Sequence, residues 1–154
     1  MDKTNVMRIL DAKKISYNHY TYPNNLLDGV SVAHALNQDE NRVFKTLVTI
    51  YNNMCYVFVI PVCKTLDLKK AAKAVGVKSL DMLPQKELLP RAGYIHGGCS
   101  PIGMKKLYKT VVDISAKDFN SIIFSAGKIG YQVELNPLDL SKVIPVEFTR
   151  VVVE

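Results

Sequence analysis

The chain has 154 residues, of which 48% are hydrophobic and 22% charged. This composition is typical of a globular protein and excludes a disordered or fibrous chain. Because a length of roughly 100–200 residues is usual for one hydrophobic core, we expect a single domain over residues 1–154. Lysine and arginine exceed aspartate and glutamate by 20 to 14, and the resulting net charge of +6 suits either a phosphate-bearing partner or a merely lysine-rich surface.

Cysteine and hydropathy patterns bear on compartment and cofactors. The three cysteines are an odd number with no CxxC pair, which argues against a disulfide framework and a zinc site. The three histidines are scattered, so no metal ligand set is evident. The first residues lack the apolar stretch of a signal peptide, and the longest apolar run, residues 54–63, is about half a membrane span. We expect a cytoplasmic protein with no membrane segment, metal or cofactor.

The N-terminal third begins with an amphipathic helix, expected over residues 4–13 with Thr4 as its N-cap. Residues 15–22 alternate aromatic and polar side chains and run into a proline, which predicts a strand followed by a loop. Ser31 is then expected to cap a short helix that continues to Leu36.

The middle of the chain contains the clearest hairpin. Residues 43–51 and 54–61 are rich in β-branched and aromatic side chains, and the two asparagines between them tolerate the positive φ of a tight turn. Asp67 is placed to cap the alanine-rich helix that follows, and Gly76 to end it. Another short helix is expected from Pro84.

The second half of the chain contains short elements separated by loops. Residues 93–103, GYIHGGCSPIG, hold too much glycine and proline for a regular element and predict a shaped loop. Strands are expected in LYKTVVDI, SIIFSAG, YQVEL and VEFTRVVV, with short helices at AKDFN and PLDLSKVI. The whole pattern predicts an α/β (α+β) fold: a mixed, largely antiparallel, barrel-like sheet of about seven strands with surrounding helices.

Lys45 lies inside the first strand of the hairpin, where both faces are largely apolar. By alternation it shares a face with Val43 and Leu47, while Phe44 and Thr46 point the other way. A lysine in this place either extends along its stem to the water at the rim or points its ammonium into a polar pocket. In a pocket it would bind an ester carbonyl or a phosphate, and the strand pattern alone leaves both options open.

Two glycine-rich loops and one cysteine complete the candidate chemistry. The loops 93–103 and 125–130 offer free backbone N–H groups and hydroxyls, which either cradle an anion or carbonyl or serve only as turns. Strand ends and loops meet at the mouth of a barrel, so the two loops and Lys45 are expected to face one another. Cys99 with His96 is the one candidate cysteine nucleophile, although their spacing does not show that they meet.

Four segments taken together resemble the YbaK/EbsC family of aminoacyl-tRNA deacylases. These are RVFKTLV around Lys45, LDLKKAAKAVG, GYIHGGCSPIG and SAGKIGYQVEL, in that order along most of the chain. The resemblance is closest to the bacterial Cys-tRNA(Pro) deacylase branch and more distant to the editing domain of prolyl-tRNA synthetase. It implies a barrel-like sheet and hydrolysis of the ester that joins cysteine to the 3′-terminal ribose of a tRNA, with no metal or cofactor.

The same resemblance implies a set of site residues and a mechanism. Lys45 matches the essential lysine of the family and would bind and polarise the 3′ aminoacyl end, while the thiol of the substrate's own cysteine attacks the ester carbonyl. Whether Lys45 meets the carbonyl or the terminal nucleotide stays open. The implied substrate-binding residues are Tyr22, Asp28, Thr46, Gly97, Gly98, Ser100, Pro101, Ile102, Gly103, Ser125, Gly127 and Gln132.

Two positions depart from the family pattern and leave the substrate less certain than the reaction. Asp28 stands where some members have an aromatic residue, and Gln132 where some have an acid. The alternatives are therefore a deacylase for alanine or another small amino acid, and a catalytically silent module that binds tRNA or a synthetase. The expected partners are the acceptor end of an aminoacyl-tRNA and, through the resemblance, prolyl-tRNA synthetase; a monomer is the default.

Overall fold

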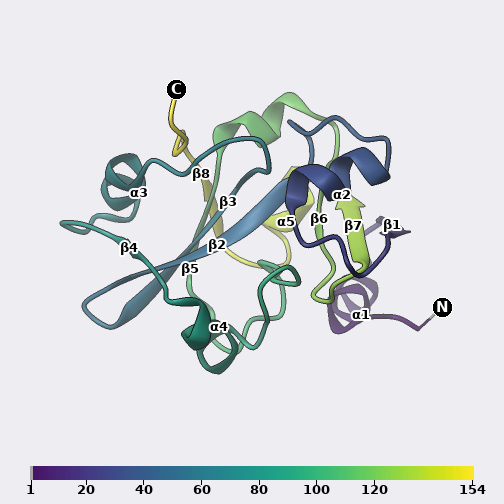
Figure 1. The fold of residues 1–154 in the computed structure, drawn as a ribbon, viewed down its shortest axis with the longest axis horizontal. Helices are drawn as coiled ribbons and strands as arrows, with labels where there is room; N and C mark the ends of the chain where they lie inside the picture. The colour runs from purple at the N-terminus through teal and green to yellow at the C-terminus, as the bar shows by residue number, and fades with distance from the viewer. Residues whose placement is uncertain (1) are drawn as a thin grey trace.

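A computed structural model describes residues 2–154, and its strands form two sheets (Figure 1). The smaller sheet has the order β1-β7-β6 and is antiparallel. The larger sheet has the order β4-β2-β3-β5-β8 and is mixed, because β5 runs parallel to both of its neighbours. The strands are β1 (Asn18–Thr21), β2 (Phe44–Tyr51), β3 (Met54–Pro61), β4 (Asp81–Met82), β5 (Lys109–Val112), β6 (Ile122–Ser125), β7 (Tyr131–Leu135) and β8 (Val146–Phe148).

The hairpin β2–β3 is the longest pairing in the molecule and confirms the prediction from its two apolar runs. Its register pairs Phe44 with Pro61 and Tyr51 with Met54. Asn52 and Asn53 make the turn at φ 49° and 65°, a left-handed conformation that asparagine tolerates better than most residues. In Figure 1 the hairpin runs from the lower left to the middle of the molecule, with α3 and β4 on the left and β7, β1 and α1 on the right.

Helices cover the sheets at both ends of the hairpin. They are α1 (Asn5–Ala12), α2 (Gly29–Ala35), α3 (Leu68–Val75), α4 (Gln85–Ala92), α5 (Pro137–Leu140) and a 3₁₀ turn, η1 (Ile114–Asp118). Thr4 caps α1 as predicted, and the Asp67 carboxylate accepts from two backbone N–H groups of α3, which ends at Gly76 with φ 75°. Two main cores result, one holding α1 against the smaller sheet and one holding α3 against β3 and β5.

The two sheets meet at the start of β2 but do not close into a barrel. An isolated parallel bridge joins Val43 to Ile123 of β6, and β4 pairs with the same edge of β2 only from Thr49 onward. Between these points no described strand is registered against that edge of β2. The mixed, largely antiparallel α/β architecture is confirmed, and the barrel-like sheet stays open along residues 44–47 of β2, since the Val48 carbonyl already accepts from the Leu83 N–H.

Other corrections are local. The described residues contain eight strands rather than about seven, because the two-residue β4 carries no sequence signal of its own. Asp28, and not Ser31, is the N-cap of α2: its carboxylate accepts from the Ser31 N–H at 3.2 Å and the Ser31 hydroxyl at 3.0 Å. Among residues 2–154, no helix is long and apolar enough to cross a lipid bilayer.

Candidate active site

A cavity of about 300 Å³ lies beside the open edge of β2. Its walls come from six regions of the chain: the β1–α2 segment, the first half of β2, the end of β3, helix α4, the loop before β5 and the strands β6 and β7. The lining residues are Tyr22, Leu27, Asp28, Gly29, Val32, Val43, Phe44, Lys45, Thr46, Leu47, Val62, Leu88, His96, Gly97, Cys99, Ser125 and Gln132. The cavity therefore occupies the gap that prevents the sheet from closing.

Lys45 is a cation of this cavity that forms no ion pair with any residue in 2–154. It is partly buried on β2, opposite Ile60 of β3. Its stem therefore lies among the apolar neighbours of the cavity, where the ammonium is available to a bound group. Its neighbour Thr46 lines the same cavity although alternation points it to the other face of β2, because the cavity opens at the strand edge.

Two buried polar atoms of cavity-lining residues have no hydrogen-bond partner among residues 2–154: Thr46 Oγ1 on β2 and Gln132 Oε1 on β7. Buried polar groups in folded proteins are nearly always paired, since leaving one unpaired costs about 1–3 kcal/mol. Ser125, registered opposite Gln132, accepts from the Gly127 N–H at 3.1 Å and keeps its own proton for another acceptor. Lys45 and these three polar side chains therefore bring a cation, two hydroxyls and an amide to one cavity.

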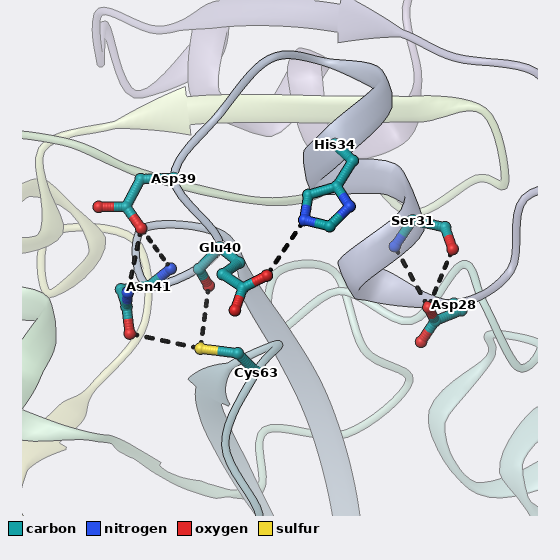
Figure 2. A network of polar contacts seen from close by, with 7 residues as sticks. All are labelled: Asp28, Ser31, His34, Asp39, Glu40, Asn41 and Cys63. Atoms are coloured by element: carbon teal, nitrogen blue, oxygen red, sulfur yellow. Dashed lines mark hydrogen bonds and ion pairs between the residues drawn. The ribbon is translucent and has the colours of Figure 1, made fainter.

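Asp28 lines the cavity, but its carboxylate is engaged in the cap of α2. Figure 2 shows it bonded to Ser31, with His34 and Glu40 forming an ion pair at 3.2 Å further along the same segment. The Asp39 carboxylate accepts from Asn41 in the turn that leads into β2. These contacts fix the segment that leads into β2 and Lys45. The cap of α2 also explains an acid at position 28, so no contact between Asp28 and a ligand is needed to explain it.

The two glycine-rich loops pack against each other beside the cavity. A Cβ on Gly98 would lie 3.1 Å from the backbone nitrogen of Ile129, so only glycine permits this approach. Gly97 takes φ 88° and lines the cavity, as does Ser125 from the other loop. The predicted meeting of the loops with Lys45 is therefore seen in the structure.

Six of the proposed substrate-binding residues do not line the cavity: Gly98, Ser100, Pro101, Ile102, Gly103 and Gly127. Ser100 is fully buried and its hydroxyl accepts from the Ile102 N–H at 3.3 Å. Ile102 belongs to the core, and Tyr94 donates to its carbonyl. Ser100 and Ile102 therefore stabilise the loop 93–103 from its buried side. The predicted residues that line the cavity are Tyr22, Asp28, Lys45, Thr46, Gly97, Ser125 and Gln132.

Cys99 and His96 both line the cavity, yet the thiol is poorly suited to act as a nucleophile. Burial raises the pKa of Cys99 to about 12, with no basic group lowering it. A thiol needs a nearby cation or a hydrogen-bond donor to become a thiolate near neutral pH. The structure thus removes the main support for a cysteine hydrolase.

Sequence reasoning missed the apolar wall of the cavity, formed by Leu27 and Val32 at α2, Val62 after β3 and Leu88 of α4. Nothing distinguishes these side chains from ordinary core residues in the sequence. They are recognised only because the fold brings three separate segments to one opening. The wall makes one side of the site suited to an apolar or thiol-bearing group.

Comparison with known proteins places this geometry in a family. Residues 25–143 match the family model described as an aminoacyl-tRNA editing domain. The chain is 47% identical over 138 residues, 88% of its length and 84% of the relative's, to an Enterococcus faecalis protein named "Putative Cys-tRNA(Pro)/Cys-tRNA(Cys) deacylase EbsC". It is also 27% identical over 99 residues to the proline–tRNA ligase of Shouchella clausii, covering 64% of this chain and 17% of the ligase.

Solved structures agree on the fold. A protein described as a "putative trans-editing enzyme for prolyl tRNA synthetase" superimposes with a TM-score of 0.85 at 18% identity, covering 99% of this chain and 100% of that one. The hypothetical protein APE2540 superimposes with a TM-score of 0.89 at 20% identity, covering 97% and 100% of the two chains. The match spans the Lys45 strand, both glycine-rich loops and the strands β6 and β7, and the chain belongs to the aminoacyl-tRNA editing domain family.

Proposed function

We propose that this protein is an aminoacyl-tRNA deacylase that removes cysteine wrongly attached to tRNA(Pro). The observation that carries the proposal is one cavity that brings Lys45, which forms no ion pair with residues 2–154, together with the polar side chains of Thr46, Ser125 and Gln132. An aminoacyl ester offers matching groups, namely a carbonyl oxygen, an ammonium and ribose hydroxyls. The 47% identity to the Enterococcus faecalis protein supports this reading.

In the proposed complex the ester lies across the cavity between β2 and β7. The Lys45 ammonium stabilises negative charge on the carbonyl oxygen or holds the terminal nucleotide, and Gln132 Oε1 accepts from the α-amino group. Ser125 donates its free proton to the aminoacyl group. Each of these groups is held on a strand, so the ester is bound in a fixed orientation.

The nucleophile in this mechanism is the substrate's own thiol, because the high pKa of Cys99 disfavours a protein thiolate. The cysteinyl sulfur attacks its own carbonyl carbon and forms a four-membered thiolactone. The bond to the 3′ oxygen of the ribose breaks, and the thiol proton ends on that oxygen. Water then hydrolyses the thiolactone to free cysteine, so the net reaction is hydrolysis of one ester.

The wider context follows from this substrate. We propose that residues 1–154 act as one editing domain that meets only the acceptor end of a tRNA, with prolyl-tRNA synthetase supplying selection of the tRNA. An intermediate of translation is cytoplasmic, so we place the activity there. The net charge of +6 favours the tRNA phosphates and predicts binding that weakens with salt.

The test is hydrolysis of Cys-tRNA(Pro) by the wild type and by Lys45→Ala. We expect the variant to keep its melting temperature within a few degrees and to lose at least about 100-fold in kcat/KM, as for removal of one oxyanion-stabilising group. Lys69→Ala, which removes an exposed lysine of α3 outside the cavity, is the matched control and should behave as wild type. Normal hydrolysis by Lys45→Ala would overturn the role given to this residue.

A further inference from the structure

An ion pair between a partly exposed guanidinium and a buried carboxylate lies on the strands that carry the active-site cavity. Arg42 precedes β2 and pairs with Glu134 of β7, whose side chain is only 7% exposed. The Glu134 carboxylate also accepts from Tyr20 at 2.5 Å, Ser121 at 2.6 Å and Asn18 at 3.3 Å. Both of its oxygens are thus fully used, and the charge is compensated where an unpaired carboxylate would be costly.

Arg42 links the start of β2 to two other strands, β6 and β7. Its guanidinium donates to the Ser121 carbonyl at 3.1 Å and to the Ser121 hydroxyl at 2.8 Å, just before β6, as well as to Glu134 of β7. Its own carbonyl accepts from the Ile123 N–H at 3.0 Å. The contacts fall at the bridge between Val43 and Ile123, where the two sheets meet. Arg42 therefore holds the larger sheet to the smaller one.

The same strands carry the opposite walls of the cavity. Lys45 lies three residues after Arg42 on β2, while Gln132 lies two residues before Glu134 and on the same face of β7. Ser125 is registered opposite Gln132. Neither Arg42 nor Glu134 lines the cavity. A change at the ion pair therefore removes no side chain that lines the cavity.

We propose that Arg42 and Glu134 are positioning residues that set the separation of Lys45 from the wall formed by Ser125 and Gln132. The kinetic consequence rests on the deacylase function proposed above, whereas the position of Lys45 can be measured without any substrate. Misplacement of a reacting group by about 1 Å can cost roughly 100-fold in rate. The ion pair is thus expected to control kcat more than substrate binding.

The test uses three variants beside the wild type. One carries both Arg42→Met and Glu134→Gln, one carries Arg42→Lys alone, and the control carries Lys70→Ala. The double variant removes both charges together, so no unpaired charge remains buried and the fold is retained. Arg42→Lys keeps the charge but loses the forked geometry. Lys70 is also a partly exposed side chain that donates to a carbonyl far along the chain, that of Val152 at 3.0 Å. It lies on α3 and does not line the cavity.

Two quantities are measured: kcat and KM for Cys-tRNA(Pro), and the NMR signal of Lys45 after ¹³C-methylation of the lysines, assigned by its absence in Lys45→Arg. We expect the double variant to lose about 10- to 100-fold in kcat with KM changed less than threefold, and to shift the Lys45 signal. Arg42→Lys should fall between it and the wild type, and Lys70→Ala should change neither quantity.

An unshifted Lys45 signal in the double variant, or a kcat within twofold of the wild type, would overturn the proposal. If the wild type hydrolyses no aminoacyl-tRNA, the deacylase function fails and the Lys45 signal alone decides: a shift confined to the Arg42 and Glu134 variants supports the positioning role, and no shift overturns it.

Discussion

Replacement of Thr46 by valine should raise the free energy of unfolding and lower the hydrolytic activity at the same time. The hydroxyl is buried and unpaired, a state that costs about 1–3 kcal/mol, and valine fills the same space without a polar atom. We expect the free energy of unfolding to rise by about 1 kcal/mol and the melting temperature by about 2–4 °C for a chain of this size. If the hydroxyl bonds the bound ester, the lost hydrogen bond of about 0.5–1.5 kcal/mol lowers kcat/KM about 2- to 12-fold.

A second threonine on the same strand provides the control. Thr49 is fully buried on β2, and its hydroxyl donates to the Tyr56 carbonyl at 2.9 Å, away from the cavity. Thr49→Val should therefore lower the free energy of unfolding by about 1 kcal/mol and leave kcat/KM unchanged. Thermal melts and steady-state hydrolysis of Cys-tRNA(Pro) measure both effects. A Thr46→Val protein that is less stable than the wild type and fully active would refute the reasoning.

Other substitutions test the roles of single side chains. Cys99→Ser should keep kcat/KM within about threefold, because a thiol with a pKa of about 12 is ionised in only about one molecule in 10⁵ at pH 7; a loss of 100-fold or more would restore a cysteine nucleophile. The pKa of Cys99 is raised in the folded state, so its contribution to stability is complete below pH 9 and is lost as the pH rises toward 12. Cys99→Ser should therefore flatten the alkaline fall in melting temperature. The part due to Tyr94, whose pKa burial also raises to about 12, should remain. Asp67→Ala should cost about 1 kcal/mol in urea unfolding through loss of the α3 cap, and an unchanged midpoint would contradict that role. Asp28→Asn should preserve both the α2 cap and activity within about twofold, whereas a large loss of activity would give the carboxylate a direct role toward the substrate.

Elements defined by local chemistry could be predicted from the sequence. The β2–β3 turn follows from two adjacent asparagines, and the bounds of α3 follow from Asp67 and Gly76, because each residue acts on backbone groups within a few positions of itself. Where two capping residues compete within one turn, as Asp28 and Ser31 do, sequence cannot tell which accepts and which donates.

The candidate site was predictable only where it carries polar or glycine residues. Lys45, Gly97 and Ser125 could be named because a strand lysine and glycine-rich loops stand out, and their convergence was expected because strand ends and loops meet at the mouth of a barrel-like sheet. The open edge of β2 depends on where β6 and β4 pair with it, which no pattern along the chain specifies. The same is true of the Arg42–Glu134 pair, whose partners lie 92 residues apart.

The most direct test of the deacylase function is release of amino acid from Cys-tRNA(Pro), Ala-tRNA(Pro) and Pro-tRNA(Pro), each incubated with the wild-type protein under the same conditions. The substrate-assisted mechanism predicts rapid release of cysteine, with alanine and proline retained, because neither of these carries a thiol. Release of alanine at the rate of cysteine would contradict that mechanism, and no release from any of the three would contradict the proposed deacylase function.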